Sequence, residues 1–292
     1  MRKALFLYNG ASGKGKTNRH LPEILARLEA IFDVVDVFKT STMEEGMEKA
    51  KQACGVYDVL VFRGGDGTFN HIVSALYGMP NPPIMGYING GTISDIGRNF
   101  GIKGNVRHAL SIIEGGHTCG FDLGLVNGEV FTYMAAVGAY ADIAYVTKRK
   151  YKKRIGRIAY YFKAIAEALR WRSVPCVVEA GGERVETKVP FLLCLSGKNV
   201  GGFRVNARES NIHDGKMEMY LTKPGLFNGL LHYLFFKVRT TKIVASEFHV
   251  QISYPEPWCL DGERGPSGDV HIKTVDSGLR IFCAEKFEEP LE

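Results

Sequence analysis

The 292-residue sequence lacks paired cysteines, a signal peptide pattern at its start and any long apolar run. Its six cysteines are scattered and form no CxxC pair, which argues against disulfides or a zinc knuckle and favours a reducing compartment. No apolar run reaches the roughly 18 residues of a membrane span, and the best candidate, 226–238, is interrupted by polar residues. These absences predict a cytoplasmic protein that touches a membrane without crossing it.

Positive charge is concentrated in one stretch. The net charge is +6, and seven of the ten residues from Lys148 to Arg157 are Lys or Arg, with no acidic residue among them. The run is either an ordinary solvated segment or a contact for an anionic partner, such as a lipid surface or nucleic acid. Because no nucleic-acid-binding module accompanies it, we expect peripheral association with an anionic membrane and no nucleic acid partner.

Strand and helix patterns alternate in the first part of the chain. Short apolar runs indicate strands, and 3.6-residue periodicity indicates helices between them. The expected strands are 3–8, 33–38, 58–62 and 83–88, and the expected helices are 21–31, 43–53, one following residue 68 and a short one starting near Ser94. This alternation predicts an α/β nucleotide-binding domain with a parallel sheet.

From about Thr118 the pattern becomes β-rich. The Asn127-Gly128 pair between two apolar runs is a strong hairpin signal. Further expected strands are 174–180, 184–195, 217–222, 247–254, 270–275 and 279–283, with one helix at 155–171. We therefore predict two domains, an α/β domain at 1–122 and a β-sandwich domain at 123–292, whose last residues can pack back on the first.

Two glycine-rich loops follow the third and fourth expected strands. In Gly64-Gly65-Asp66-Gly67-Thr68 the glycines allow backbone amides to approach phosphates, and Asp66 can reach a nucleotide or its metal. Gly90-Gly91-Thr92, followed by Asp95, offers similar chemistry on what should be the same sheet edge. Either loop can also be a plain structural turn.

Residues 10–17 match the P-loop pattern G-x-x-x-x-G-K-[ST] after a strand. Pro22 follows closely, and we expect it to break the helix that a P-loop requires. A solvated basic turn is the simpler interpretation.

Acidic turns in the second half are candidate catalytic or metal sites. Asp261-Gly262-Glu263 follows an apolar triplet, and His213-Asp214-Gly215 can hold a hard cation through carboxylate and carbonyl oxygens. Each is equally compatible with a surface turn. The apolar positions of 226–238 fit the buried face of a helix or, alternatively, a lid that meets lipid.

Together these segments resemble the diacylglycerol kinase-like catalytic domain of bacterial lipid kinases, diacylglycerol kinases and sphingosine kinases, over nearly the whole chain. The segments similar to the family's motifs, in order, are 9–13, the intact GGDGT at 64–68 with Asn70, 91–95, the basic 152–157, Gly201-Gly202, Asp214-Gly215 and 261–263. NAD kinases share GGDGT, but their later Gly-Ser-Thr-Ala-Tyr motif has no counterpart here.

Several residues depart from the family pattern. Gly10 replaces a proline, Ser94 an asparagine, and His213 stands where an acid is common. Tyr133 and Tyr140 stand where the family tends to place Asn and Asp. These departures bear more on which molecule accepts the phosphoryl group than on the phosphoryl transfer itself.

The resemblance implies an ATP- and Mg²⁺-dependent lipid kinase with an NAD kinase/phosphofructokinase-like first domain. It transfers the γ-phosphoryl group to a lipid hydroxyl, of diacylglycerol or a sphingoid-type alcohol. The implied ATP-binding residues are Asn9, Ser12, Thr40, Gly64, Gly65, Asp66, Gly67, Thr68, Gly91 and Thr92, and the implied acceptor-side residues are Ser94 and Asp95. Asp261 is the implied general base, with Glu263 nearby to orient or bind metal. A structural Mg²⁺ is implied at Asn211, Asp214 and Lys216, the lysine through its carbonyl.

Three other functions stay open at this point. They are a catalytically silent nucleotide- or lipid-binding relative, an NAD kinase-like enzyme and a P-loop NTPase. The oligomeric state is also open, with a homodimer among the alternatives.

Overall fold

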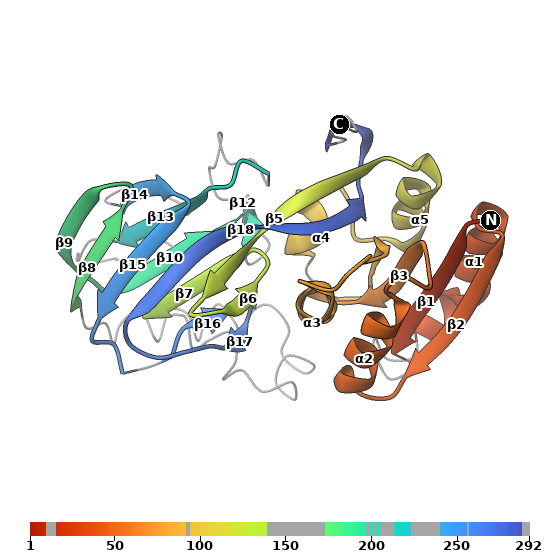
Figure 1. Cartoon of the computed structure of the whole chain (residues 1–292), viewed down its shortest axis with the longest axis horizontal. Helices are drawn as coiled ribbons and strands as arrows, with labels where there is room; N and C mark the ends of the chain where they lie inside the picture. Colours follow the sequence, from red (N-terminus) through yellow and green to blue (C-terminus); the bar gives the residue numbers. More distant parts are fainter. Residues whose placement is uncertain are drawn as a thin grey trace. The chain divides into compact units, whose positions relative to one another are not determined.

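The computed structural model describes residues 1–9, 16–91, 94–138, 173–196, 199–200, 203–204, 213–222, 240–255 and 257–287 (Figure 1). The chain divides into two compact units, Met1–Phe121 with Asp276–Glu292 and Asp122–Val275. The sequence placed the boundary after residue 122 with the last residues returning, and here the returning segment begins at Asp276. Predicted features outside the described residues are the loop 10–15, the basic run 148–157, the helix 155–171, Gly201-Gly202 and the apolar run 226–238.

The first unit contains a parallel sheet with strand order β2-β1-β3-β4, of which β2, β1 and β3 are labelled in Figure 1. The strands are β1 (Lys3–Asn9), β2 (Val34–Thr40), β3 (Val59–Gly64) and β4 (Ile84–Asn89). All six residues of β3 are buried, as in a parallel sheet covered by helices on both faces. The end of β18 (Val270–Phe282) adds a further parallel strand beside β4, where Ile281 pairs with Met85.

Helices follow each of these strands. They are α1 (Lys16–Ile31), α2 (Met43–Ala53), α3 (Asp66–Leu76), α4 (Asp95–Asn99) and α5 (Val106–Gly115). α1 packs against α5, and α2 packs against α3. The alternation confirms the predicted α/β domain. No helix in the described ranges is long and apolar enough to serve as a membrane span.

α1 corrects one prediction. The helix begins at Lys16 and continues through Pro22, which we expected to break it. Proline removes one backbone hydrogen bond and crowds the carbonyl four residues earlier. Here the helix tolerates that loss, since Ile24 and Leu28 are fully buried on its inner face. Pro22 is therefore no argument against a phosphate-binding loop before α1.

α5 was missing from the sequence prediction. Its amino end is capped by Asn105, whose side chain accepts a hydrogen bond from the backbone N–H of His108 at 2.7 Å. Its carboxyl end is followed by Gly116 at φ 76°. These are ordinary start and stop signals. The apolar spacing between them would have predicted the helix.

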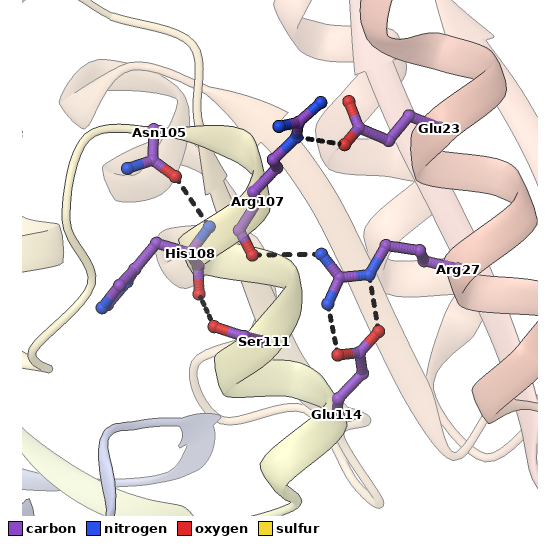
Figure 2. Close-up of polar contacts among 7 residues, drawn as sticks. All are labelled: Glu23, Arg27, Asn105, Arg107, His108, Ser111 and Glu114. Atoms are coloured by element: carbon purple, nitrogen blue, oxygen red, sulfur yellow. Dashed lines mark hydrogen bonds and ion pairs between the residues drawn. The ribbon is translucent and has the colours of Figure 1, made fainter.

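Ion pairs join α1 and α5 (Figure 2). Arg27 of α1 forms a two-point contact with Glu114, including an Nε to Oε1 distance of 2.6 Å, and donates to the carbonyl of Arg107 at 3.2 Å. Arg107 in turn contacts Glu23 at 2.7 Å. These contacts link the two helices, which pack against each other.

The second unit consists mainly of antiparallel strands. One sheet has the order β14-β13-β10-β7-β16-β17, and β15 lies between β8 and the start of β18 in the other. The strands are β5 (Thr118–Val126, starting in the first unit), β6 (Glu129–Phe131), β7 (Met134–Gly138), β8 (Val174–Ala180), β9 (Glu183–Val189), β10 (Phe191–Leu195), β11 (Asn199–Val200), β12 (Phe203–Arg204), β13 (Met217–Thr222), β14 (Thr240–Ala245), β15 (Glu247–Ile252), β16 (Cys259–Leu260) and β17 (Glu263–Arg264). A short 3-10 turn, η2 (Glu285–Phe287), follows β18 in the first unit.

Side chains from both sheets share one core. Phe248 and Ile272 on one sheet belong to the same buried cluster as Leu192 and Met219 on the other, and Trp258 is fully buried with them. A β domain with a single core between two sheets confirms the predicted C-terminal fold.

Some strand limits differ from the prediction. Runs 270–275 and 279–283 form one continuous strand, within which Gly278 takes φ 63°, a conformation that glycine adopts without steric cost. Run 184–195 splits into β9 and β10 at Pro190, which cannot donate to a ladder. The Asn127-Gly128 hairpin between β5 and β6 forms as predicted.

Candidate functional site

The predicted nucleotide-binding residues of the first unit gather at the carboxyl ends of its parallel strands. Asn9 ends β1 opposite Thr40, the last residue of β2. Gly64 ends β3 opposite Asn89, the last residue of β4. Ligands of open α/β sheets bind at this edge. The four positions form one row there.

The two glycine loops lie side by side, as the sequence predicted. The N–H of Gly90 donates to the carbonyl of Gly64 at 2.7 Å. A Cβ on Gly65 would lie 3.6 Å from the Cα of Gly91, and one on Gly64 would lie 2.3 Å from the Cβ of Thr68. A side chain at position 64 would therefore clash with the start of α3.

Acidic groups and helix amino ends meet beside these loops. α3 begins at Asp66, so Gly67 and Thr68 form its first turn. The Asp66 Oδ2 accepts the N–H of Asp95, the first residue of α4, at 3.4 Å. Ser94 and Asp95 are both buried. Oriented N–H groups and one or two carboxylates are what a phosphate with its metal requires.

Asn89 supports the second glycine loop and was not predicted as a site residue. Its Oδ1 accepts the N–H of Gly91 at 2.8 Å and the hydroxyl of Tyr87 at 3.3 Å. Burial, with a smaller contribution from the charge of Asp66, raises the pKa of Tyr87 well above its usual value. The phenol therefore stays protonated and keeps its donor role.

Arg63 is the second unpredicted residue at this edge. It precedes Gly64 and is only 6% exposed. Its Nε and Nη1 are buried and have no hydrogen-bond partner in the part of the chain that the structure describes. A Cβ on Gly90 would lie 3.7 Å from the Arg63 Nε, so the guanidinium lies beneath the second glycine loop. Burial lowers its pKa, and an uncompensated buried charge is unfavourable without an anion.

In the second unit, Asp261 and Gly262 form the turn between β16 and β17. Their φ angles are 52° and 93°, as in the two-residue turns that suit antiparallel hairpins. Asp261 is 6% exposed, whereas Glu263, two residues later on β17, is exposed.

The Asp261 carboxylate holds the connection between β6 and β7. Oδ2 accepts from the N–H and the hydroxyl of Thr132 at 2.5 and 2.6 Å, and Oδ1 accepts from the N–H groups of Tyr133 and Met134 at 3.0 and 2.9 Å. Burial raises the pKa of Asp261, against the lowering effect of these hydrogen bonds. A carboxylate has about four acceptor positions, and the four donors occupy them.

The turn at 214–216, which was predicted to hold a structural metal ion, is exposed, and the buried carboxylate of Asp122 supports it. Asp214 Oδ1 accepts the N–H of Lys216 at 3.1 Å, and the N–H of Gly215 donates to Asp122 Oδ2 at 2.7 Å. Carboxylate and carbonyl oxygens are ligands that fit Mg²⁺. Asp122 was not predicted. Asn211, the third predicted ligand, lies outside the described residues.

The other predicted residues cannot be placed. Ser12 and Thr92 lie outside the described residues, as does Tyr140. The nucleotide residues described above all belong to the first unit, and Asp214, Lys216, Asp261 and Glu263 belong to the second.

Comparisons with known proteins agree with this fold and these loops. Residues 3–126 match the sequence model of the diacylglycerol kinase catalytic domain. Diacylglycerol kinases of Staphylococcus aureus strains bovine RF122 / ET3-1 and MRSA252 are each 29% identical over 234 residues, covering 80% of this chain and 74% of the relative. A solved diacylglycerol kinase from Bacillus anthracis str. Sterne has a TM-score of 0.79 at 19% identity, covering 98% of both chains. Another solved structure from that organism has a TM-score of 0.86 at 20% identity, covering 98% of this chain and 96% of that chain.

The match to the diacylglycerol kinase catalytic domain spans the GGDGT loop between β3 and α3, and with the similar relatives it supports a kinase, a transferase of lipid metabolism. The match over residues 3–126 and the similarity to known diacylglycerol kinases support a lipid kinase of the diacylglycerol kinase-like family. The predicted family, fold class and enzyme class are confirmed.

Proposed function

We propose that this lipid kinase transfers the γ-phosphoryl group of ATP, with Mg²⁺, to the hydroxyl of diacylglycerol or a similar lipid alcohol. The observation that carries the proposal is the row of strand ends and glycine loops with the unpaired Arg63 beneath it. This edge offers backbone amides, a helix amino end and a buried positive charge to one anion. A polyphosphate complements all three.

The residues of the first unit would bind and orient the nucleotide. Backbone amides of Gly65, Gly67 and Gly91 would face the phosphates, and Arg63 would supply a charge-assisted hydrogen bond. Asp66 and Asp95 fit a Mg²⁺–phosphate complex, since Mg²⁺ in kinases is held by one or two carboxylates plus substrate phosphates. Bound Mg²⁺ would stabilise charge on the transferring phosphoryl group.

The Asp261 turn would supply the general base. The resemblance assigned this role to Asp261, but its four acceptor positions hold the β6–β7 connection. The geometry therefore favours Glu263 as the proton acceptor, with Asp261 as the residue that positions the turn. A carboxylate of ordinary basicity suffices, because the proton moves late in a loose phosphoryl transfer.

The second metal site and the membrane contact are also part of the proposal. Asp214, Lys216 through its carbonyl, and Asn211 would hold a structural Mg²⁺ at a turn that Asp122 anchors. The basic run 148–157 would attract an anionic membrane from the cytoplasmic side, so that an insoluble alcohol can react at the surface.

The test is Mg²⁺-dependent transfer of labelled phosphate from ATP to diacylglycerol, monoacylglycerol and a sphingoid base in mixed micelles. Wild type, Asp66→Asn and the exposed control Arg107→Met are compared. We expect transfer to one lipid class, lost in Asp66→Asn and retained in the control. ATP binding without transfer to any alcohol would instead support a silent nucleotide-binding relative.

A further inference from the structure

Three potential metal ligands lie on the outer face of β15 and β18 in the second unit. Glu247 and His249 alternate along β15 with the fully buried Phe248, so both project away from the core. His271 of β18 is directly opposite His249 in the antiparallel register. Directly opposite side chains in such a pair are close neighbours.

The ligand atoms of these three residues converge. The Nε2 of His271 contacts Glu247 Oε1, and the Nε2 of His249 lies 3.7 Å from the same oxygen. The two imidazole rings are stacked, with centroids 4.3 Å apart and planes 1° from parallel. One nitrogen or oxygen atom from each residue lies within 4.8 Å of the others.

The backbone beneath this cluster is well fixed. His271 exchanges two hydrogen bonds with the β5–β6 hairpin, donating its N–H to Asn127 Oδ1 at 2.8 Å and accepting from the Asn127 N–H at 2.9 Å. Two neighbouring strands and a hairpin therefore place the three side chains. Ordering a loop would not be needed to bind an ion.

We propose that Glu247, His249 and His271 form a binding site for a late first-row transition ion such as Zn²⁺. Imidazole suits zinc, nickel and copper, and two histidines with one carboxylate leave further positions for water. Two ligands about 2 Å from one zinc ion at the tetrahedral angle lie roughly 3.4 Å apart, so the three side chains are near enough to share an ion once the stacked imidazole rings rotate to point their nitrogens at it. Mg²⁺ prefers oxygen ligands and should not compete.

An ordinary ion pair accounts for only part of this arrangement. His20 and Glu23 on α1 show what such a pair needs, one histidine and one carboxylate 3.6 Å apart. The second imidazole is not required for it. His249 is also opposite Glu179 on β8, but Arg184 contacts that carboxylate at 2.5 Å. Glu247 is therefore the carboxylate available to both histidines.

Metal binding would join β15 to β18 through side chains, as well as through the backbone ladder. An ion that binds only the folded state stabilises it in proportion to the logarithm of its concentration over Kd. Thermal unfolding should therefore shift to higher temperature with Zn²⁺. The proposal does not depend on the acceptor, the nucleotide or the catalytic residues.

The experiment is Zn²⁺ titration of the untagged full chain against a chromophoric chelator, repeated with excess Mg²⁺. His249→Gln, His271→Gln and Glu247→Gln are compared with the control His20→Gln, and circular dichroism checks that each variant is folded. Loss of an outer-sphere partner alone costs roughly 10- to 100-fold in affinity, so each of the first three changes should raise Kd at least tenfold. The control should leave Kd unchanged, and Mg²⁺ should not displace Zn²⁺.

Two results would overturn the proposal. One is a wild-type Kd for Zn²⁺ no lower than that of the double variant His249→Gln/His271→Gln. The cluster would then be an ordinary surface ion pair and not a metal site. The other is an equal loss in His20→Gln, which would indicate nonspecific binding by histidines. If Zn²⁺ still raised the unfolding temperature of the double variant, that would likewise indicate nonspecific binding.

Discussion

Replacing Arg63 with methionine should stabilise the protein while weakening its nucleotide affinity. The guanidinium is 6% exposed and has two buried nitrogens without a hydrogen-bond partner among the described residues. Methionine keeps most of the side-chain volume and removes the charge. Exchanging buried ionic groups for apolar ones of similar volume is neutral or stabilising by about 1–4 kcal/mol. The free energy of unfolding without ligand should therefore rise by an amount in this range.

The same change should remove a contact to phosphate. A hydrogen bond to a charged group contributes about 1.5–3 kcal/mol, which corresponds to roughly 10- to 150-fold in Kd. Calorimetric titration with MgATP, without lipid, measures the affinity, and denaturant unfolding of the free protein measures stability. The control is Arg107→Met, whose side chain is 81% exposed and forms an exposed ion pair with Glu23. A destabilised Arg63→Met with unchanged Kd would show that Arg63 is structural and refute the reasoning.

Three further changes test other parts of the molecule. Glu263→Gln should lower kcat with little effect on stability, whereas Asp261→Asn should destabilise the protein by about 1–3 kcal/mol, because an amide cannot accept all four hydrogen bonds. A larger loss of kcat in Asp261→Asn than in Glu263→Gln, without loss of stability, would restore Asp261 as the base. Tyr57 donates to Asp36 at 2.7 Å, and burial raises its pKa to about 12. The stabilising effect of protonated Tyr57 is present below about pH 10 and lost as the pH rises towards 12. The stability advantage of wild type over Tyr57→Phe should therefore shrink across that window. Curves of unfolding free energy against pH that stay parallel for the two proteins would contradict this. Glu114→Gln should weaken the contact with Arg27 and cost about 0.5–1 kcal/mol, less in high salt, and a salt-independent loss would point to packing instead.

The sequence predicted the features whose physics is local. Apolar runs predicted the strands, the glycine loops after two of them predicted a phosphate-binding edge of the sheet, and Asn127-Gly128 predicted a hairpin. Gly65 and Gly91 were expected on one edge because carboxyl ends of parallel strands share it, and they lie together.

Other features depend on tertiary contacts that no local pattern reports. Pro22 was expected to end a helix, but packing of α1 on the sheet outweighs its local effect. Arginine usually lies on the surface, and only the fold shows that Arg63 is buried. Asp261 has the sequence of an exposed turn, yet it accepts four hydrogen bonds from residues 132–134, more than 120 positions earlier. Such long-range partners could not be assigned from spacing.

The path of β18 has a consequence for how the protein is made. Residues 276–282 complete the first unit by pairing Ile281 with Met85 of β4, so that unit stays unfinished until the ribosome has made the whole second unit and residues 276–282 after it. A fragment ending near residue 126, the limit of the family match, would leave β4 with an unpaired edge. We expect such a fragment to self-associate during expression, whereas a fragment extended by a linked copy of 276–287 should stay monodisperse.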